Sequence, residues 1–180
     1  MTEPRTHGSV DALYAFAVGV WLALLQFSYY FMVEVYLSSR STSFFISLFF
    51  WLVGFLIGLN LPCRTFVPLV VATPLAYCGA LALLHQSPYR LLLLAAVAPS
   101  IAIGGMTAGA FFPHARQRFA RVRPLLFHEN NGFITGILLA LLGATLHGRL
   151  LLTFVAPAGA LPVLLYLLLA ERSDSVGPRR

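Results

Sequence analysis

Six long apolar segments, separated by short polar connections, make up most of the 180-residue chain. They cover residues 12–36, 44–61, 66–84, 91–112, 125–146 and 150–169. Each approaches the ~20 residues that an α-helix needs to cross a bilayer. Charged residues form only 10% of the sequence, against about a quarter in soluble domains. We therefore predict an all-α polytopic membrane protein, a bundle of six transmembrane helices within residues 12–170.

The polar stretches outside these segments are too short to bury a core. Residues 1–11 are predicted to be a cytoplasmic N-terminal segment, and residues 171–180 a disordered cytoplasmic tail. The N-terminus lacks a basic region followed by a short apolar core and a cleavage site, so we expect no signal peptide to be removed. Nucleic-acid binding is not expected, because the charges fall at helix ends instead of forming one patch.

The arginines indicate the orientation, since six helices place both termini on one side of the membrane. The side with the termini would hold Arg5, Arg64, Arg116, Arg118, Arg121, Arg123, Arg172, Arg179 and Arg180, and the other side Arg40, Arg90 and Arg149. Basic residues accumulate in cytoplasmic loops. We expect a bacterial inner-membrane protein with cytoplasmic termini, with Glu129 near the cytoplasmic surface and Glu34 near the outer one.

The fifth segment combines polar residues with a face of small residues. Without its polar quartet, which is His128, Glu129, Asn130 and Asn131, this segment is too short to span a bilayer. The quartet must therefore lie in the membrane or at its edge. Steps of three or four residues from Glu129 reach Gly132, Gly136, Ala140, Gly143 and His147. Small residues let a neighbouring helix approach closely, so we expect the other five helices to pack around this face.

Other glycines and prolines indicate close packing and broken helices. Gly54 and Gly58 form a pair of small residues in the second helix, and Gly105 and Gly109 lie in a small-residue run of the fourth. Pro74 is expected to kink the third helix. Paired prolines in the third and sixth helices resemble the broken helices of transporters: Pro68, Pro74, Pro157 and Pro162.

Two passages resemble the membrane domain of the spermidine synthase-like family. One has Glu34 ahead of Trp51-Leu52-Val53-Gly54 and Gly58. The other joins a Gly/Met-rich run from Gly105, ending in Phe112-Pro113, to Glu129, Gly132 and Gly136, with Leu126 in place of the family's tyrosine. The family's nucleotide-type catalytic domain has no counterpart here. The resemblance implies a stand-alone membrane module whose soluble half is absent or encoded separately.

Two glutamates are the candidate functional residues. Glu129 is either a proton- or cation-handling carboxylate, or an interfacial residue paired with Arg64 or an arginine of the 116–123 loop. Glu34 is expected to be structural, with Arg40 as an available partner. Because they are expected at opposite membrane surfaces, the two cannot act together as an acid–base pair.

The histidines and the aromatic residues invite further hypotheses. His114 with His128, or His85 with His147, could supply two axial haem ligands, but all four stand at helix ends. The aromatic cluster of Phe27, Tyr29, Tyr30 and Phe31 favours lipid contact or core packing, with a quinone or lipid pocket as the alternative. We expect no metal and no resident cofactor.

The preferred hypothesis is a non-catalytic membrane subunit or docking module of a larger assembly. It would contact lipid and a protein partner or second copy, using Glu129, Asn130, Asn131, Gly132, Gly136, Glu34 and His128. No catalytic residue is predicted. One alternative is a small transporter of a cationic or amphipathic solute that uses Glu129 and Glu34. A further alternative is a redox subunit that binds haem or quinone.

Overall fold

The structure is a computed structural model that describes residues 8–37, 41–119 and 121–176. These residues form helices and turns, and no strand occurs among them. The elements are α1 (Gly8–Tyr36), α2 (Ser41–Leu59), η1 (Cys63–Thr65), α3 (Phe66–Gln86), η2 (Leu91–Leu93), α4 (Leu94–Ala115), α5 (Val122–Leu150), η3 (Leu151–Val155), α6 (Ala156–Ala158) and α7 (Ala160–Val176). The prediction of an all-helical chain is confirmed.

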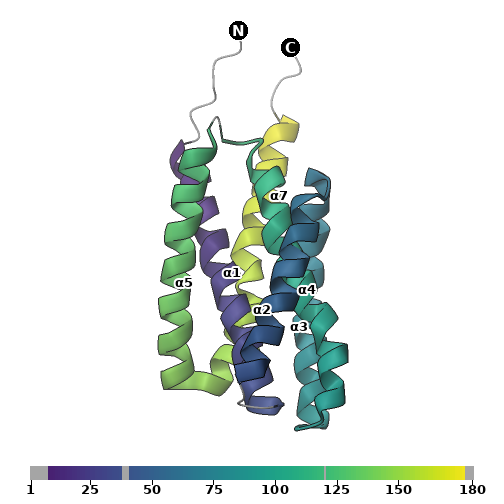
Figure 1. Cartoon of the computed structure of the whole chain (residues 1–180). Coiled ribbons are helices and arrows are strands. Elements are labelled where there is room, and N and C mark those ends of the chain that lie inside the picture. The colour runs from purple at the N-terminus through teal and green to yellow at the C-terminus, as the bar shows by residue number, and fades with distance from the viewer. Residues whose placement is uncertain (1–7, 38–40, 120, 177–180) are drawn as a thin grey trace.

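Five of the described helices are long and apolar enough to cross a membrane by length and composition. They are Gly8–Tyr36, Cys63–Gln86, Leu94–Ala115, Val122–Gly148 and Thr153–Ala170. The apolar stretch of α2, Ser43–Leu59, is shorter. The long helices run up and down along one bundle, and α1 begins at the same end at which α7 finishes (Figure 1). We call this the terminal end, and the opposite one the distal end.

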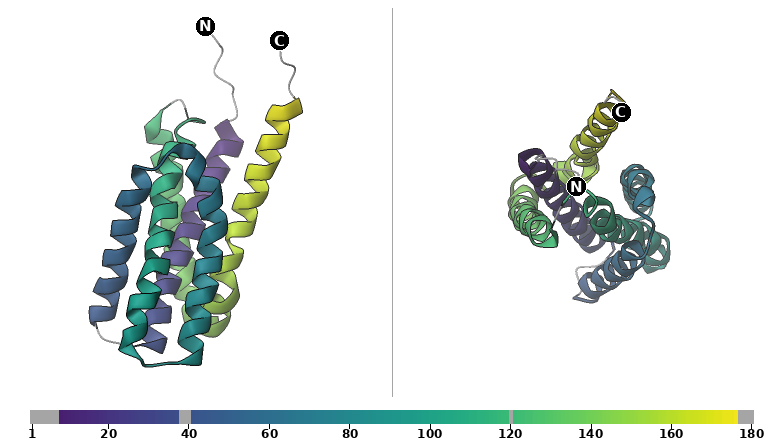
Figure 2. Two further views of the ribbon diagram at one scale, coloured as in Figure 1. Left: turned by 90° about the vertical axis from the view of Figure 1, so that its right-hand side faces the viewer. Right: turned by 90° about the horizontal axis from the view of Figure 1, so that it is seen from above.

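The helices α1 and α4 occupy the centre of the bundle. Seen from above, α5 and α7 flank α1, while α2 and α3 flank α4 (Figure 2). In the apolar 18-residue stretch of each helix, 61% is buried in α4 and 50% in α1, but only 17% in α5. The expectation that five helices surround the fifth one is therefore wrong. The small-residue face of α5 is one narrow strip, which α1 covers at Gly132 and Gly136 and η3 at Gly143, whereas α1 carries large buried side chains on several faces.

Several helix boundaries differ from those expected from the sequence. Pro113 does not stop α4, which continues through it to Ala115, and α3 ends at Gln86, two residues beyond the expected Leu84. The fifth helix extends to Leu150, with non-helical backbone angles at His147. The sixth predicted helix is divided into a π-helical turn (η3), the short α6 and α7, with the break at Gly159.

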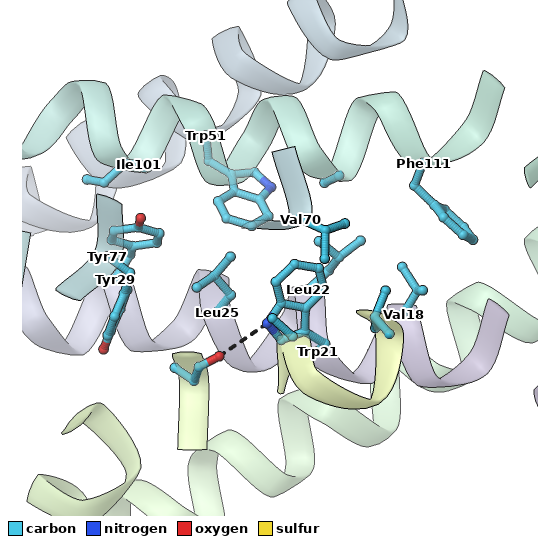
Figure 3. Close-up of a cluster of buried hydrophobic side chains, with 14 of the residues drawn as sticks. Val18, Trp21, Leu22, Leu25, Tyr29, Trp51, Val70, Tyr77, Ile101 and Phe111 are labelled. Atoms are coloured by element: carbon cyan, nitrogen blue, oxygen red, sulfur yellow. Dashed lines mark hydrogen bonds between the residues drawn. The ribbon is translucent and has the colours of Figure 1, made fainter. Parts of the chain in front are cut away.

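A core of large side chains between α1, α3 and α4 holds the bundle together (Figure 3). Trp21, Tyr29, Tyr77, Phe66 and Phe111 are the largest of its fully buried members.

The Trp21 ring of this core also secures the divided sixth helix. Its indole nitrogen donates a 3.1 Å hydrogen bond to the carbonyl of Ala156, and a Cβ added at Gly159 would lie 2.5 Å from the ring. The missing side chain of Gly159 thus makes room for Trp21, whose indole bonds to the carbonyl of Ala156 three residues earlier.

Candidate functional site

Two strips of close backbone contact lie in the bundle, and the first joins α2 to α4. In this α2–α4 seam, a Cβ added at Gly54 would overlap the carbonyl of Ala102, and one at Gly105 would overlap the carbonyl of Trp51. Gly58 against Met106 and Gly109 against Phe55 repeat the pattern one turn further on. Both helices thus contribute glycines that the backbone of the other helix approaches, so the structure brings all four glycines into one parallel interface.

The second strip, the α1–α5 seam, also joins two parallel helices. A Cβ on Gly132 would overlap the carbonyl of Phe16, and one on Gly136 would lie 2.5 Å from the carbonyl oxygen of Val20. On the other helix, a Cβ added at Gly19 of α1 would overlap the backbone carbonyl of Glu129. The small-residue face of α5 is therefore covered within the chain, and it is not free to contact a partner.

Glu129 lies at the terminal end of this seam. Glu129 is only 7% exposed, although most of the surface of α5 is exposed. Among the described residues, no hydrogen bond or ion pair of its carboxylate is recorded, so the expected pairing with Arg64 or with the 116–123 loop is not made there. A buried carboxyl without a partner is costly, and in membrane helices such groups are functional candidates by default.

The next two residues of α5 point the other way. Asn130 and Asn131 are exposed, and His128 is half-buried with its ring 5.4 Å from that of Phe127. The Asn131 amide donates to the carbonyl of Phe127 in its own helix at 2.7 Å, and the structure records no partner for the Asn130 side chain within the described residues. The polar quartet is thus divided, with a carboxyl directed inward and two amides outward.

Glu34 lies far from Glu129, near the distal end of α1. It is half-buried, and the hydroxyl of Tyr30 interacts with its carboxylate. Glu129 is level with Gly19, so the two carboxyls are separated by roughly 22 Å along the helix axis. They cannot act on the same atom. Arg40, the expected partner of Glu34, is outside the described residues.

The histidines do not converge on one site. His114 stacks on Phe66 with 4.9 Å between ring centroids, while His85 packs edge-on against Tyr36 at 6.1 Å. Within the part of the chain that the structure describes, no group of three or more His, Cys, Asp or Glu side chains is placed to hold a metal ion.

A polar cluster that the sequence analysis missed ties the terminal end together. The Tyr166 hydroxyl donates to Asp11 at 2.9 Å and accepts a 3.2 Å hydrogen bond from Arg118. The rings of Tyr14 and Tyr166 stack at 4.2 Å, and the Arg118 guanidinium lies 5.4 Å from the Tyr166 centroid. Residues from α1, α7 and the 116–121 loop are linked here. Asp11 and Arg118 were counted only as parts of polar segments, because their meeting depends on the fold.

Within the described residues, these features define a helical bundle with five membrane-length helices and a mostly buried glutamate for which no partner is recorded. Comparison with known proteins gives no relative: no family model, curated protein or solved structure matches the chain.

Proposed function

We propose that this chain is a non-catalytic integral membrane subunit that docks on a partner in the bilayer through the outer face of α5. The exposure of Asn130 and Asn131 carries this proposal. The opposite face of α5 is already covered by α1, so the outer face is the one left for a partner.

The depth of the two asparagines makes lipid an unfavourable neighbour. The span Val122–Gly148 is 27 residues long, so it exceeds the ~20 residues that cross the hydrocarbon core. With the span centred, Asn130 lies roughly 8 Å inside the core. Amide groups without partners cost several kcal/mol in lipid, whereas a helix of a second protein can supply hydrogen bonds. The flanking exposed residues Phe127, Ile134 and Leu138 add apolar contact area.

The membrane topology that fits this proposal has six spans and cytoplasmic termini in a bacterial inner membrane. At 19 residues, α2 is about 28 Å long, close to the thickness of a hydrocarbon core. Arg64, Arg116, Arg118, Arg121 and Arg123 gather at the terminal end. Arg5, Arg179 and Arg180 are outside the described residues. A C-terminal fluorescent-protein fusion should be fluorescent, because this reporter matures in the cytoplasm, and a dark but full-length fusion would reverse the orientation.

The resemblance to spermidine synthase-like membrane domains fits a module that works beside a separate soluble protein. In that case the arginines between and beside α4 and α5 at the terminal end, Arg116, Arg118, Arg121 and Arg123, offer a second contact with the same partner.

The test is purification of the tagged protein from its native membranes in mild detergent, followed by mass spectrometry. We expect a stoichiometric protein partner, or a dimer of this chain, which is lost when Asn130→Leu and Asn131→Leu are combined. Asn60→Leu is the matched control, because Asn60 is also exposed and also donates to its own helix, to Leu56 at 2.8 Å. A monomer that purifies alone, or a partner that survives the double substitution, contradicts the proposal.

The unpaired carboxyl of Glu129 favours a second candidate function, transport of a cationic or amphipathic solute. The divided last helix supports it, since interrupted helices line transporter sites. Proteoliposomes exposed to ethidium, a cationic amphipathic probe, test this function. Transport predicts uptake that Glu129→Gln abolishes without altering the elution of the protein, while equal uptake by both proteins would discard it.

A further inference from the structure

A cavity of about 110 Å³ opens between α1 and α2, on the distal half of the bundle. Its lining residues are Gln26, Phe27, Tyr29, Tyr30, Phe44, Ser47, Leu48, Trp51 and Ile101. Five of these nine carry aromatic rings, and no charged side chain is among them. For comparison, an engineered apolar cavity of roughly 150 Å³ holds one benzene molecule. The cavity is smaller than that and open on one side, so it suits one planar, uncharged ring whose substituents extend through the opening.

The inner walls of the cavity are fixed by contacts with α4. The Tyr29 hydroxyl lies 2.7 Å from the hydroxyl of Ser100 and donates to the carbonyl of the same residue at 2.9 Å. Gly104 lets two of the rings approach: a Cβ there would lie 2.9 Å from Cζ3 of Trp51 and 3.1 Å from Cε2 of Tyr29. Figure 3 shows Trp51, Tyr29 and Ile101 in this part of the core. A ligand ring would meet preformed walls.

One polar group in the wall of the cavity has no hydrogen-bond partner. Ser47 is 5% exposed, and its hydroxyl is buried without a hydrogen-bond partner. Because a buried unsatisfied hydroxyl costs about 1–3 kcal/mol, it points to a bound group that hydrogen-bonds with it. The side-chain amide of Gln26 is a second lining group that can donate or accept. Together they suit a ligand with carbonyl or hydroxyl oxygens on the ring.

The entrance faces an apolar surface. Phe44 is 41% exposed at the rim, where its ring packs edge-on against Tyr30 at 5.3 Å, and neighbouring Phe45 and Phe49 are 64% and 60% exposed. A ligand would therefore enter from lipid and carry its own apolar portion.

We propose that this cavity binds the head group of a membrane-soluble quinone or phenol: a neutral planar ring with oxygen substituents. The aromatic walls, the absence of charged groups from the lining and the unpartnered Ser47 hydroxyl all fit this class. An acyl chain would use neither the hydroxyl nor the flat walls.

The two tryptophans allow a direct test, because the chain has only Trp21 and Trp51 and only Trp51 lines the cavity. Trp21→Phe leaves Trp51 as the sole reporter, and Trp51→Phe is the matched control that retains Trp21. Both proteins, in nanodiscs of one lipid composition, are titrated with tetramethyl-1,4-benzoquinone. We expect saturable quenching for the protein that retains Trp51. The control should show only the linear quenching that follows from the partition of quinone into lipid.

Substitutions at Ser47 measure the role of its hydroxyl in the Trp21→Phe background. Ser47→Ala should weaken binding about two- to tenfold, the worth of one hydrogen bond. Ser47→Leu should fill the cavity and abolish saturation. Linear quenching in all variants, or saturable quenching unchanged by Ser47→Leu, would overturn the proposal. So would quenching of Trp51 by brominated-acyl lipid that the quinone fails to relieve, because an acyl chain would then occupy the cavity.

Discussion

The α2–α4 and α1–α5 seams solve the same packing problem with different chemistry. Both bring parallel helices that are not consecutive in the chain into backbone contact through glycines. In the α2–α4 seam the glycines come in equal number from both helices, and the contact is apolar throughout. In the α1–α5 seam α1 supplies only Gly19, and the contact includes the carboxyl-bearing Glu129.

The difference separates an interface that serves the fold from one beside which we propose a functional contact. The α2–α4 seam has a mutual fit and lies beside the central helix α4, so it stabilises the bundle. The α1–α5 seam contains the mostly buried Glu129, whose carboxylate has no recorded partner among the described residues, and α5 keeps most of its surface open. The helix α5 lies at the edge of the bundle, with a buried glutamate on one face and two amides on the other. This arrangement fits the proposed contact with a partner protein.

The largest effect is expected in the α2–α4 seam. Gly54→Ile combined with Gly105→Ile places branched side chains against the backbone on both sides, where neither helix can yield. We expect the free energy of unfolding in mixed detergent–SDS micelles to fall by about 3 kcal/mol or more. Gly79→Ile is the matched control, since nothing lies within 4 Å of a Cβ at that position. Equal losses in the variant and the control would mean that the seam is not closely packed.

A smaller loss is expected in the α1–α5 seam. Gly132→Leu should cost about 2 kcal/mol, because α5 lies at the edge and can move outward while the rest of the bundle persists. Hydrogen exchange should then increase in α5 and remain unchanged in α2 and α4. The control on the same helix is Gly148→Leu, where a Cβ meets no atom within 4 Å. Exchange that increases throughout the bundle would show that the two seams are one cooperative unit.

Glu129→Gln should change stability in the opposite direction. Glutamine keeps the shape of the side chain and removes the charge, so the free energy of unfolding should rise by about 1 kcal/mol. The same denaturation assay measures it at pH 8, where a solvated carboxyl is ionised. A loss of stability instead would reveal a charged or hydrogen-bonding partner for the carboxylate.

The smallest change is expected at Gly143→Ala. Its Cβ would lie 2.9 Å from Cδ1 of Leu151, the end of a flexible side chain that can rotate away. We expect stability to change by less than about 0.5 kcal/mol. A loss as large as that of Gly132→Leu would show that side-chain and backbone neighbours restrict glycines equally.

The sequence predicts much of the helix content and little of the arrangement. Continuous apolar runs mark the helices because each run must satisfy its own backbone in lipid. The sequence shows four small residues in these helices, Gly54, Gly58, Gly105 and Gly109. Because glycine has no side chain to identify its partner, the pairing of α2 with α4 cannot be predicted from the sequence.

The central position of α1 is hidden for a related reason. Every membrane helix is apolar on all faces, whether it lies at the centre or at the edge, so periodicity does not separate α1 from α5. At the candidate sites, the aromatic residues near Tyr29 are visible in the sequence, whereas the cavity beside them depends on the spacing between α1 and α2. The direction of Glu129 and Asn130, one inward and one outward, likewise required the fold.

The pairing of parallel, non-consecutive helices also sets an order for assembly during synthesis. Gly54 and Ala102 are separated by only about two-fifths of the length of chain that separates Phe16 from Gly132. At roughly 5–20 residues per second, α1 must wait about 6–23 s for the part of α5 that covers it. Until then the Gly19 face of α1 is open to lipid or to the insertion machinery, so the α2–α4 pair forms first and α5 closes the bundle late.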